Sequence, residues 1–384
     1  MKSSIFLTPS KILYGEGSLA DLETKVESFG SKALLVTDST MSEVGYADKV
    51  ASVLKSAGVD YVIYDEVDQE PTDNLVYKGL ELYQQNGCDF LVSLGGGSPL
   101  DAAKAIGVLV TNEGEITDFK GQNKVSKELP PHISIPTTAG TGSEVTKVTI
   151  IADTKNDVKM LIGSPRIVPD MAVVDSELTM SVPAKFTAAT GVDALTHAIE
   201  AYTSKLNQPL TDNLSISAIK RISKYLRRAW ANGDDREARN ELHLAATEAG
   251  LAFSNSSVTI VHGMSRPIGA LFHVPHGISN AVLLPACMEF AVMGAPERFA
   301  EVAEAMGVEN AGDDLECAYA GVEAVKKLCA EVEIPTISEL GIDDKEFMKY
   351  AEKMANDAID SGSPGNTYRK PTVEDIVGLY KKAL

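Results

Sequence analysis

The first half of the chain alternates short apolar runs with helical stretches, and this alternation restricts the fold more than any other feature. Runs rich in β-branched residues occupy residues 32–38, 60–64 and 89–94. Helical patterns occupy residues 48–57 and 74–85, and a third reaches Val110. Short apolar strands separated by helices indicate a parallel sheet with helices on both faces. A further pair of runs, residues 132–136 and 145–152, brackets a turn rich in Gly and Thr.

The character of the sequence changes near residues 175–183. From there to Leu384 the residues Ala, Leu, Glu and Lys dominate at helical spacing, and strand patterns fade. Helices are predicted at residues 185–203, 212–232, 236–254, 296–306, 315–332 and 344–360. A length of 384 residues also exceeds that of one ordinary domain. We therefore expect an α/β domain over residues 1–180, an all-α domain over residues 181–384, and a site in the cleft between them.

The charge and the cysteines exclude several classes of protein. The chain carries 35 Lys and Arg against 54 Asp and Glu, a net charge of −19, so binding to nucleic acid or to an anionic membrane is not expected. No signal peptide or long uncharged apolar run is visible, so no membrane span is expected. The four cysteines form no CxxC pair, which argues against disulfides or a thiolate zinc site and favours a cytoplasmic protein: Cys88, Cys287, Cys317 and Cys329.

Two loops combine glycines with hydroxyl side chains. Leu94–Gly107 (LGGGSPLDAAKAIG) places three glycines between a strand and a helix, and Pro136–Thr146 (PTTAGTGSEVT) is the second loop. Glycines let backbone N–H groups approach an anion, and a helix N-terminus adds its positive dipole. Neither loop is a Walker motif or a GxGxxG turn. Two such loops favour a pyrophosphate, although a tight connection between elements explains the first loop equally well.

Asp38 stands at the end of the first clear strand. An acidic residue there accepts hydrogen bonds from the adenosine ribose and repels a 2′-phosphate, which favours NAD over NADP. An aspartate that only caps a helix or a turn fits the same position.

One aspartate and three histidines form a candidate metal site. Asp193 and His197 are four residues apart on an Ala-rich helix and share one face, and His262 and His276 follow downstream. One oxygen and three nitrogen donors suit Fe²⁺ or Zn²⁺. Histidines that are only hydrogen-bonded in a core are the alternative, and the pattern leaves both open. His132 and His243 are interpreted as ordinary histidines, and His273 is ambiguous.

Five ordered motifs resemble the iron-containing (group III) alcohol dehydrogenases over essentially the whole chain. They are TPSKILYGEGS, GGGSPLDAAKAIG, IPTTAGTGSEVT, GVDALTHAIEAYTS and FHVPHGISNAVLLP. The resemblance implies a dehydroquinate-synthase-like fold, with a dinucleotide-binding α/β domain and an all-helical domain. It implies the metal ligands Asp193, His197, His262 and His276. It implies the cofactor contacts Asp38, Gly96, Gly97, Ser98, Asp101, Thr137, Thr138, Thr141, Lys159 and Leu178.

Two positions depart from the family pattern. Many relatives carry a further histidine four residues after the third ligand, where this chain has Arg266. Arg266 either attracts an anionic or strongly polar substrate or forms a structural ion pair. Some relatives have Asn before Pro-Thr near the cofactor, where this chain has Glu70, so nothing is carried over at that position.

The resemblance implies hydride transfer between NAD(H) and a small alcohol or aldehyde, with the metal as Lewis acid. The aldehyde or alcohol is expected to be a primary alcohol, a diol or a hydroxyaldehyde. A metal-dependent hydrolase or lyase on the same fold is the alternative, and a non-catalytic nucleotide-binding module leaves the Asp/His set unexplained. Family members commonly form dimers or larger homo-oligomers, and an exposed strand at Ser4–Leu7 is a candidate for pairing between subunits.

Overall fold

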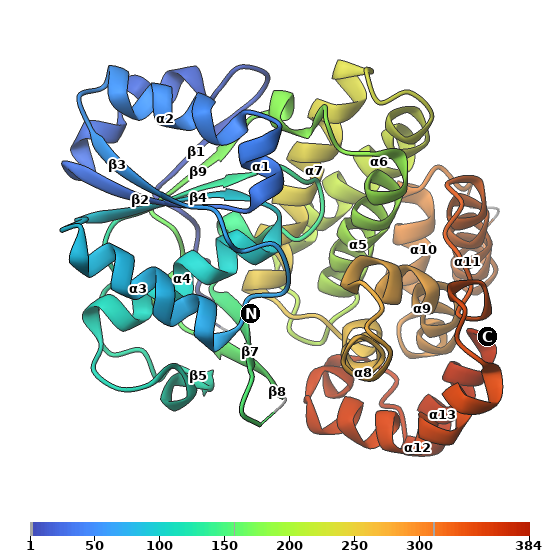
Figure 1. The fold of residues 1–384 in the computed structure, drawn as a ribbon. Coiled ribbons are helices and arrows are strands. Elements are labelled where there is room, and N and C mark those ends of the chain that lie inside the picture. The colour runs from blue at the N-terminus through green and yellow to red at the C-terminus, as the bar shows by residue number, and fades with distance from the viewer. Residues whose placement is uncertain (1–2, 157, 310–311) are drawn as a thin grey trace. The chain divides into compact units, whose positions relative to one another are not determined.

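A computed structural model describes residues 3–156, 158–309 and 312–384 of the chain (Figure 1). The chain divides into two compact units. The first, called the α/β unit below, is Leu7–Ser181. The second, called the helical unit, is Val182–Leu384 together with residues 3–6. Each unit is described by itself.

A parallel sheet forms the centre of the α/β unit. Its strand order is β1 (Lys11–Tyr14), β9 (Met171–Val174), β6 (His132–Pro136), β4 (Phe90–Gly95), β2 (Lys32–Val36) and β3 (Asp60–Tyr64). All neighbouring pairs among these described strands are parallel. The carboxyl ends of β2, β4 and β6, which are neighbours, therefore lie at one edge of the sheet.

Side chains alternate between the two faces of this sheet, and each face has its own core. In β2, Ala33 and Leu35 pack with helix α2 (Tyr46–Ser56), whereas Leu34 and Val36 pack with helices α3 (Asp73–Gln85) and α4 (Gly97–Thr111). Successive residues of a strand point to opposite faces, so this run of apolar residues requires cover on both sides. Figure 1 shows α2 on one face and α3 and α4 on the other. The predicted parallel sheet with helices on both faces is confirmed.

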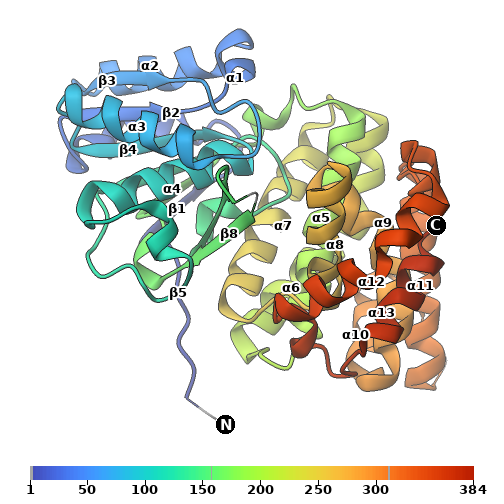
Figure 2. The same cartoon turned by 60° about the horizontal axis from the view of Figure 1, so that its bottom comes forward.

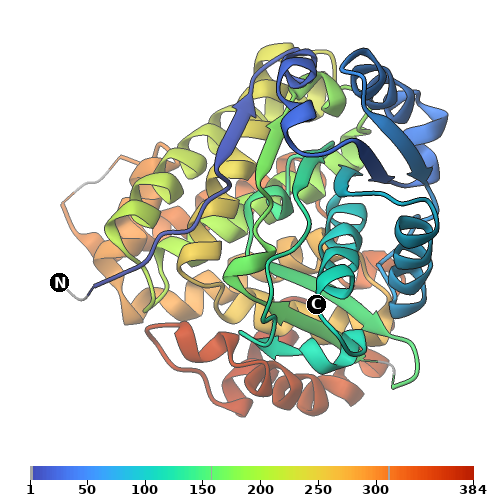
Figure 3. The same ribbon diagram turned by 90° about the vertical axis from the view of Figure 1, so that its left-hand side faces the viewer.

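The first and the last of the predicted strands, at residues 4–7 and 145–152, differ from the structure. Residues 4–7, expected as a strand, form no regular element, and the sheet begins at Lys11, after Pro9. Figure 3 shows this first segment running from the N-terminus toward β1. The run expected at residues 145–152 is the strand β7 (Val148–Asp153), which belongs to a separate small sheet. It pairs antiparallel with β8 (Val158–Gly163), and β5 (Gly121–Gln122) completes that sheet.

The helical unit contains no strand among its described residues, as the sequence predicts. Figure 2 shows its helices packed around one another. Their bounds are α5 (Ala184–Tyr202), α6 (Pro209–Ala231), α7 (Arg236–Asn255), α8 (Ile260–Phe272), α9 (His276–Ala291), α10 (Pro296–Ala305), α11 (Asp314–Glu331), α12 (Asp344–Asp360) and α13 (Val373–Lys382).

Helices α8, α9 and α13 are absent from the sequence prediction. Helix α8 contains Pro267 and α9 contains Pro285, and both are strongly apolar. Helix α9 is apolar nearly all round and shows no amphipathic period, whereas α8 has a distinct apolar face that Pro267 interrupts. The segment His276–Gly294 is long and apolar enough to cross a membrane by length and composition alone, and 67% of it is buried inside the structure. Such burial is typical of a core helix.

Helix α5 is the most enclosed of these helices. It contacts α6, α7 and α9, and nearly every residue from Thr187 to Tyr202 is buried. Its Ala-rich sequence allows this close packing, because small side chains let neighbouring helices approach. The polar residues of α5 are consequently held at fixed positions away from bulk water.

Candidate metal centre and cofactor loops

Four predicted ligands meet in the helical unit. Helix α5 carries Asp193 and His197, α8 carries His262, and α9 begins with His276. One ligand atom from each residue lies within 4.8 Å of the others. Three of these residues are buried and His276 is exposed. The structure thus brings together all four residues from three helices that are distant in sequence.

The spacing of these donor atoms fits a small divalent cation. Nε2 of His262 lies 2.9 Å from Nε2 of His197 and 3.8 Å from Oδ1 of Asp193. Donors that surround one ion at about 2.0–2.2 Å are necessarily close to each other in this way. A carboxylate oxygen with three imidazole nitrogens is a donor set for Fe²⁺ or Zn²⁺, whereas Mg²⁺ and Ca²⁺ prefer oxygen alone.

The protonation states also favour a cation. Burial lowers the pKa of His262 well below its ordinary value, and the charges of His197 and His276 lower it further. Burial alone raises the pKa of Asp193, but the three imidazoles and the amide of Asn280 outweigh that effect, so its pKa lies below the ordinary value. A neutral imidazole, as at His262, and an ionised carboxylate, as at Asp193, are the forms that bind metals.

Two residues that sequence reasoning missed lie directly against this set. Nδ2 of Asn280 is 2.6 Å from Oδ1 of Asp193, and it lies 3.0 and 3.1 Å from Nε2 of His262 and of His276. Oε2 of Glu200 lies 2.5 Å from Nδ1 of His262. Both follow a predicted ligand by one helical turn: Asn280 is four residues after His276, and Glu200 is three residues after His197. That spacing was the available signal.

Gly277 allows helix α9 to approach α5 at the site. A Cβ atom at this position would lie 2.9 Å from the carbonyl oxygen of Ala189 on α5. Real side chains essentially never tolerate such a contact. The glycine therefore permits the approach that brings its neighbour His276 to the ligands of α5.

The remaining histidines lie elsewhere. His132 is buried in β6 with Nε2 2.9 Å from Oγ of Ser93, and His243 is buried on α7. His273 is exposed and ends α8 with φ of 54°. None of them belongs to the set of four. The interpretation of His132 and His243 as ordinary histidines agrees with these positions.

Arg266 lies one turn after His262 on α8. Its guanidinium donates to Oγ of Ser363 at 3.2 Å. Within residues 3–156, 158–309 and 312–384, no carboxylate is recorded within ion-pair distance of it. The structural ion pair considered as one alternative for Arg266 is thus not formed in the described part of the chain.

In the α/β unit the candidate cofactor residues gather at the carboxyl edge of the sheet. Asp38 follows β2, the first glycine-rich loop follows β4, and the second loop follows β6. A Cβ atom at Gly97 would lie 3.0 Å from Cγ2 of Thr141, and one at Gly96 would lie 3.8 Å from the side chain of Thr138. The two loops are therefore side by side, with Ser98 and Thr137 in the same region. Ligands of open α/β sheets bind at this edge.

Asp38 has a structural role that sequence reasoning considered. Its Oδ1 accepts from the backbone N–H of Met41 at 3.0 Å, which caps helix α1 (Ser39–Glu43). Its Oδ2 faces the first loop, 2.9 Å from a Cβ position at Gly95. Burial raises the pKa of Asp38 above the ordinary value. One oxygen is used by the cap, and the other is directed toward the glycines.

Asp101 and Lys104 connect α4 to the second loop. Oδ1 of Asp101 accepts from Oγ of Ser143 at 2.6 Å. The ammonium of Lys104 is fully buried and donates to Ser143, Thr146 and the carbonyl of Val148 at 2.8–2.9 Å. Burial lowers the pKa of Lys104 to about 8, although Asp101 and Glu144 oppose this change. Sequence reasoning missed Lys104, and it gave Asp101 a cofactor role without this structural one.

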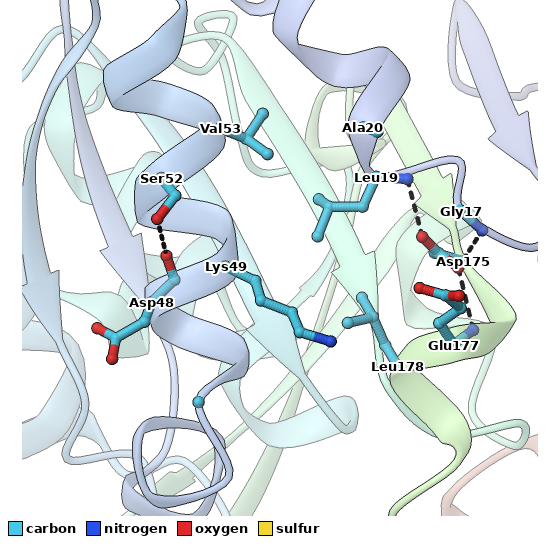
Figure 4. Close-up of a pocket in the computed structure, with 11 residues that line it drawn as sticks. Gly17, Leu19, Ala20, Asp48, Lys49, Ser52, Val53, Asp175, Glu177 and Leu178 are labelled. Carbon is cyan, nitrogen blue, oxygen red and sulfur yellow. Dashed lines mark hydrogen bonds between the residues drawn. The ribbon is translucent and has the colours of Figure 1, made fainter.

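Lys159 and Leu178 each have partners of their own in the α/β unit. Nζ of Lys159, on β8, pairs with Oε1 of Glu70 at 2.8 Å. Leu178 is 1% exposed, and its side chain joins the core on the α2 side of the sheet. It also borders a hollow of ≈ 460 Å³ next to Leu19 and Lys49, which Figure 4 shows. The carboxylate of Asp175 at this hollow is occupied by backbone N–H groups, including that of Leu19 at 2.9 Å.

Comparison with known proteins gives matches over nearly the whole chain. The family model "Iron-containing alcohol dehydrogenase" matches residues 9–176, and "Fe-containing alcohol dehydrogenase family, C-terminal" matches residues 187–384. An NAD-dependent methanol dehydrogenase of Bacillus methanolicus is 38% identical and both chains are covered completely. A 1,3-propanediol dehydrogenase of Citrobacter freundii is 37% identical, with 98% of each chain covered. The crystal structure of a 1,3-propanediol oxidoreductase matches with a TM-score of 0.97, 36% identity and full coverage of both chains.

The buried ammonium of Lys104 predicts a pH-dependent stability. Its pKa is about 8 in the folded chain, below the ordinary 10.5, so the unfolded chain holds more protons between these two pH values. Stability therefore rises with pH in that window, by about 3 kcal/mol for a change of this size. Thermal unfolding of the wild type and of Lys104→Met should be measured from pH 8 to 10.5. The free energy of unfolding of the wild type should rise relative to that of the variant over this range. If the free energies of both proteins change equally with pH, the lowered pKa of Lys104 is contradicted.

Proposed function

Because the chain belongs to the iron-containing alcohol dehydrogenase family and is therefore a metal-dependent alcohol dehydrogenase or aldehyde reductase, we propose that it transfers hydride between NAD(H) and a small primary alcohol or diol and the corresponding aldehyde. The observation that carries this proposal is the convergence of Asp193, His197, His262 and His276 in the helical unit. These donors fit a metal, and the family is defined by one.

The four ligands would hold Fe²⁺, and Zn²⁺ suits the same donors. When bound, such an ion supplies Lewis-acid polarisation of the substrate oxygen. Three ligands are buried, which keeps competing water away from them, whereas the exposed His276 leaves the donor set reachable from solvent. A small substrate has access from that side, and burial together with the neighbouring histidines disfavours protonation of His262.

The cofactor is proposed to bind at the carboxyl edge of the parallel sheet. Backbone N–H groups at the start of α4, from Gly96 to Ser98, are available to the pyrophosphate, and Thr138 and Thr141 add hydroxyl donors. Lys104 holds the second loop in place through hydrogen bonds to Ser143 and Thr146. Asp38 would accept from the adenosine ribose, Lys159 would contact the nicotinamide ribose, and Leu178 would border the adenine. Asp101 completes the contacts proposed around the pyrophosphate.

The substrate is proposed to be short and polar. The relatives named for methanol and for 1,3-propanediol favour a primary alcohol or a diol. Arg266 places a guanidinium one turn from the ligand His262; burial lowers its pKa, the charge of Glu200 opposes that change, and no ion pair to it is formed among the described residues. A cation at that position favours substrates with a second polar group or with negative charge.

We also propose a cytoplasmic homodimer or larger homo-oligomer. The four cysteines are free and buried, as expected in a reducing compartment. Ile5 is 75% exposed, and the amide of Gln208 reaches its carbonyl at 3.4 Å. Leu206 and Leu210, on either side of Gln208 in the chain, are 55% and 56% exposed. Exposed apolar side chains near one another favour contact with another subunit.

Replacing His262 tests the metal centre. His262→Ala should lose its metal and lower kcat/KM for a small aldehyde by about 10³-fold or more, because the polarisation of the substrate oxygen is lost. Binding of NADH, measured by fluorescence titration, should remain. Metal content per chain is measured by mass spectrometry after reconstitution with Fe²⁺.

His273→Asn is the matched control. His273 lies in the same stretch of sequence but outside the set of four, and Asn tolerates its left-handed backbone. This variant should keep both metal and turnover. Full activity of a metal-free His262→Ala protein would contradict the proposed role of the metal.

Replacing Asp38 tests the choice of cofactor. Asp38→Gly should lower the NADH over NADPH ratio of kcat/KM by about tenfold or more, because a carboxylate that repels the 2′-phosphate is removed. Asp38→Asn separates charge from structure, because Asn caps helix α1 as well as Asp does. The NADH over NADPH ratio of kcat/KM should fall in both variants. An unchanged ratio in both would exclude Asp38 from cofactor selection.

A further inference from the structure

A carboxylate outside the ligand set lies buried behind one of the ligands. Glu200 is on α5, one turn beyond His197, and it is 2% exposed. A carboxylate removed from water is costly unless hydrogen bonds compensate it. All the hydrogen-bond donors recorded for Glu200 come from the beginning of helix α8, the helix that carries His262.

These hydrogen bonds divide between the two carboxylate oxygens. Oε1 accepts from Oγ1 of Thr259 and from the backbone N–H of Val261, each at 2.7 Å. Oε2 lies 2.5 Å from Nδ1 of His262. The N–H of Val261 belongs to the first turn of α8, where the helix itself offers no acceptor. Glu200 thus joins α5 to the N-terminus of α8, where negative charge is favourable.

The contact with Oε2 determines which nitrogen of His262 carries hydrogen. A neutral imidazole has one N–H and one lone pair. Nδ1 faces a carboxylate oxygen and donates to it, so Nε2 presents its lone pair. Nε2 is the atom that lies 2.9 Å from Nε2 of His197 and 3.8 Å from Oδ1 of Asp193. The lone pair is therefore directed toward the other ligands.

We propose that Glu200 is a positioning residue for the metal: by accepting the Nδ1 hydrogen of His262 it fixes the tautomer and the ring direction of that ligand, while its other oxygen anchors it to the backbone of α8. This inference rests on the proposed metal centre. Carboxylates in this position also raise the basicity of the imidazole they contact, and their loss typically weakens metal binding about 10–100-fold.

Glutamine at this position cannot do both tasks. Its single oxygen can face His262 or the pair formed by Thr259 and Val261, but not both. With the amide nitrogen toward His262, the tautomer with hydrogen on Nε2 becomes favoured, and that form offers no lone pair to a metal. With the amide nitrogen toward Val261, two N–H donors oppose each other. Glu200→Gln keeps the shape of the side chain and changes this one property.

The experiment measures the affinity of the purified chain for Zn²⁺ by competition with a chromophoric chelator. Glu200→Gln should bind about 10–100-fold more weakly than the wild type. Thr259→Val is the matched control, because it removes one hydrogen bond to Oε1 and leaves the contact with His262. It should change the affinity by no more than about threefold. NADH binding, measured in parallel, should be equal in all three proteins.

The outcomes separate this inference from the proposed function. Equal Zn²⁺ affinity in the wild type and in Glu200→Gln overturns the role of Glu200 and leaves the metal centre in place. A wild-type chain that binds no Zn²⁺ overturns both. An equal loss in Thr259→Val and Glu200→Gln shows that Glu200 acts through the start of α8 alone, which also overturns the proposal.

A measurement on the unaltered chain decides the question if Glu200→Gln does not fold. The metal-free protein, labelled with ¹⁵N in its six histidines, reports the tautomer of each imidazole by NMR without a metal to impose it. The assignment of His262 follows from the signal that is lost in His262→Gln. Hydrogen on Nδ1 of His262 is the expected result, and hydrogen on Nε2 would overturn the proposal.

Discussion

The burial of charge along helix α5 is the constraint on which the helical unit depends. Along one side of this helix lie Asp193, His197 and Glu200, each about one turn after the last. The side chain of each is less than 5% exposed. Groups of this kind are unstable in an apolar interior unless other groups compensate them. The compensation comes from α8 and α9, through His262, His276, Asn280 and the first turn of α8. The packing of these three helices therefore depends on the same contacts that set the geometry of the donor set.

The α/β unit meets a comparable requirement in a different way. Its parallel sheet places the ends of β2, β4 and β6 at one edge, and the loops there consist of glycines and hydroxyl residues that expose backbone N–H groups. Such loops need hydrogen bonds to the rest of the unit to hold their shape. Lys104 and Asp101 on helix α4 make these hydrogen bonds, to Ser143, to Thr146 and to strand β7. Burying the ammonium of Lys104 costs free energy. Because its hydrogen bonds are made inside the unit, the outer surface of the loop remains available to a ligand.

The sequence predicted much of this arrangement because its signals are local. Asp193 and His197 share a helix face, and glycine-rich loops follow apolar strands, so one window of sequence reveals each. His262 and His276 were proposed from the donor set itself, and the family resemblance, which the comparisons confirm, implies the same four ligands. What the sequence could not reveal depends on contacts between distant segments. Glu200 is an ordinary helix residue until α8 is placed against it, and Lys104 is unremarkable until the second loop covers it. The strands β1 and β9 are short, helix α9 shows no amphipathic period, and a proline interrupts the amphipathic pattern of α8.

The central claim is that one divalent ion is held by one oxygen and three nitrogens from α5, α8 and α9. Crystals of the chain reconstituted with Fe²⁺, measured at the iron absorption edge, test it most directly. The account predicts a single anomalous peak at about 2.0–2.3 Å from a carboxylate oxygen of Asp193 and from one ring nitrogen each of His197, His262 and His276. An anomalous peak at any other place, or one contacted by only some of these side chains, would contradict it.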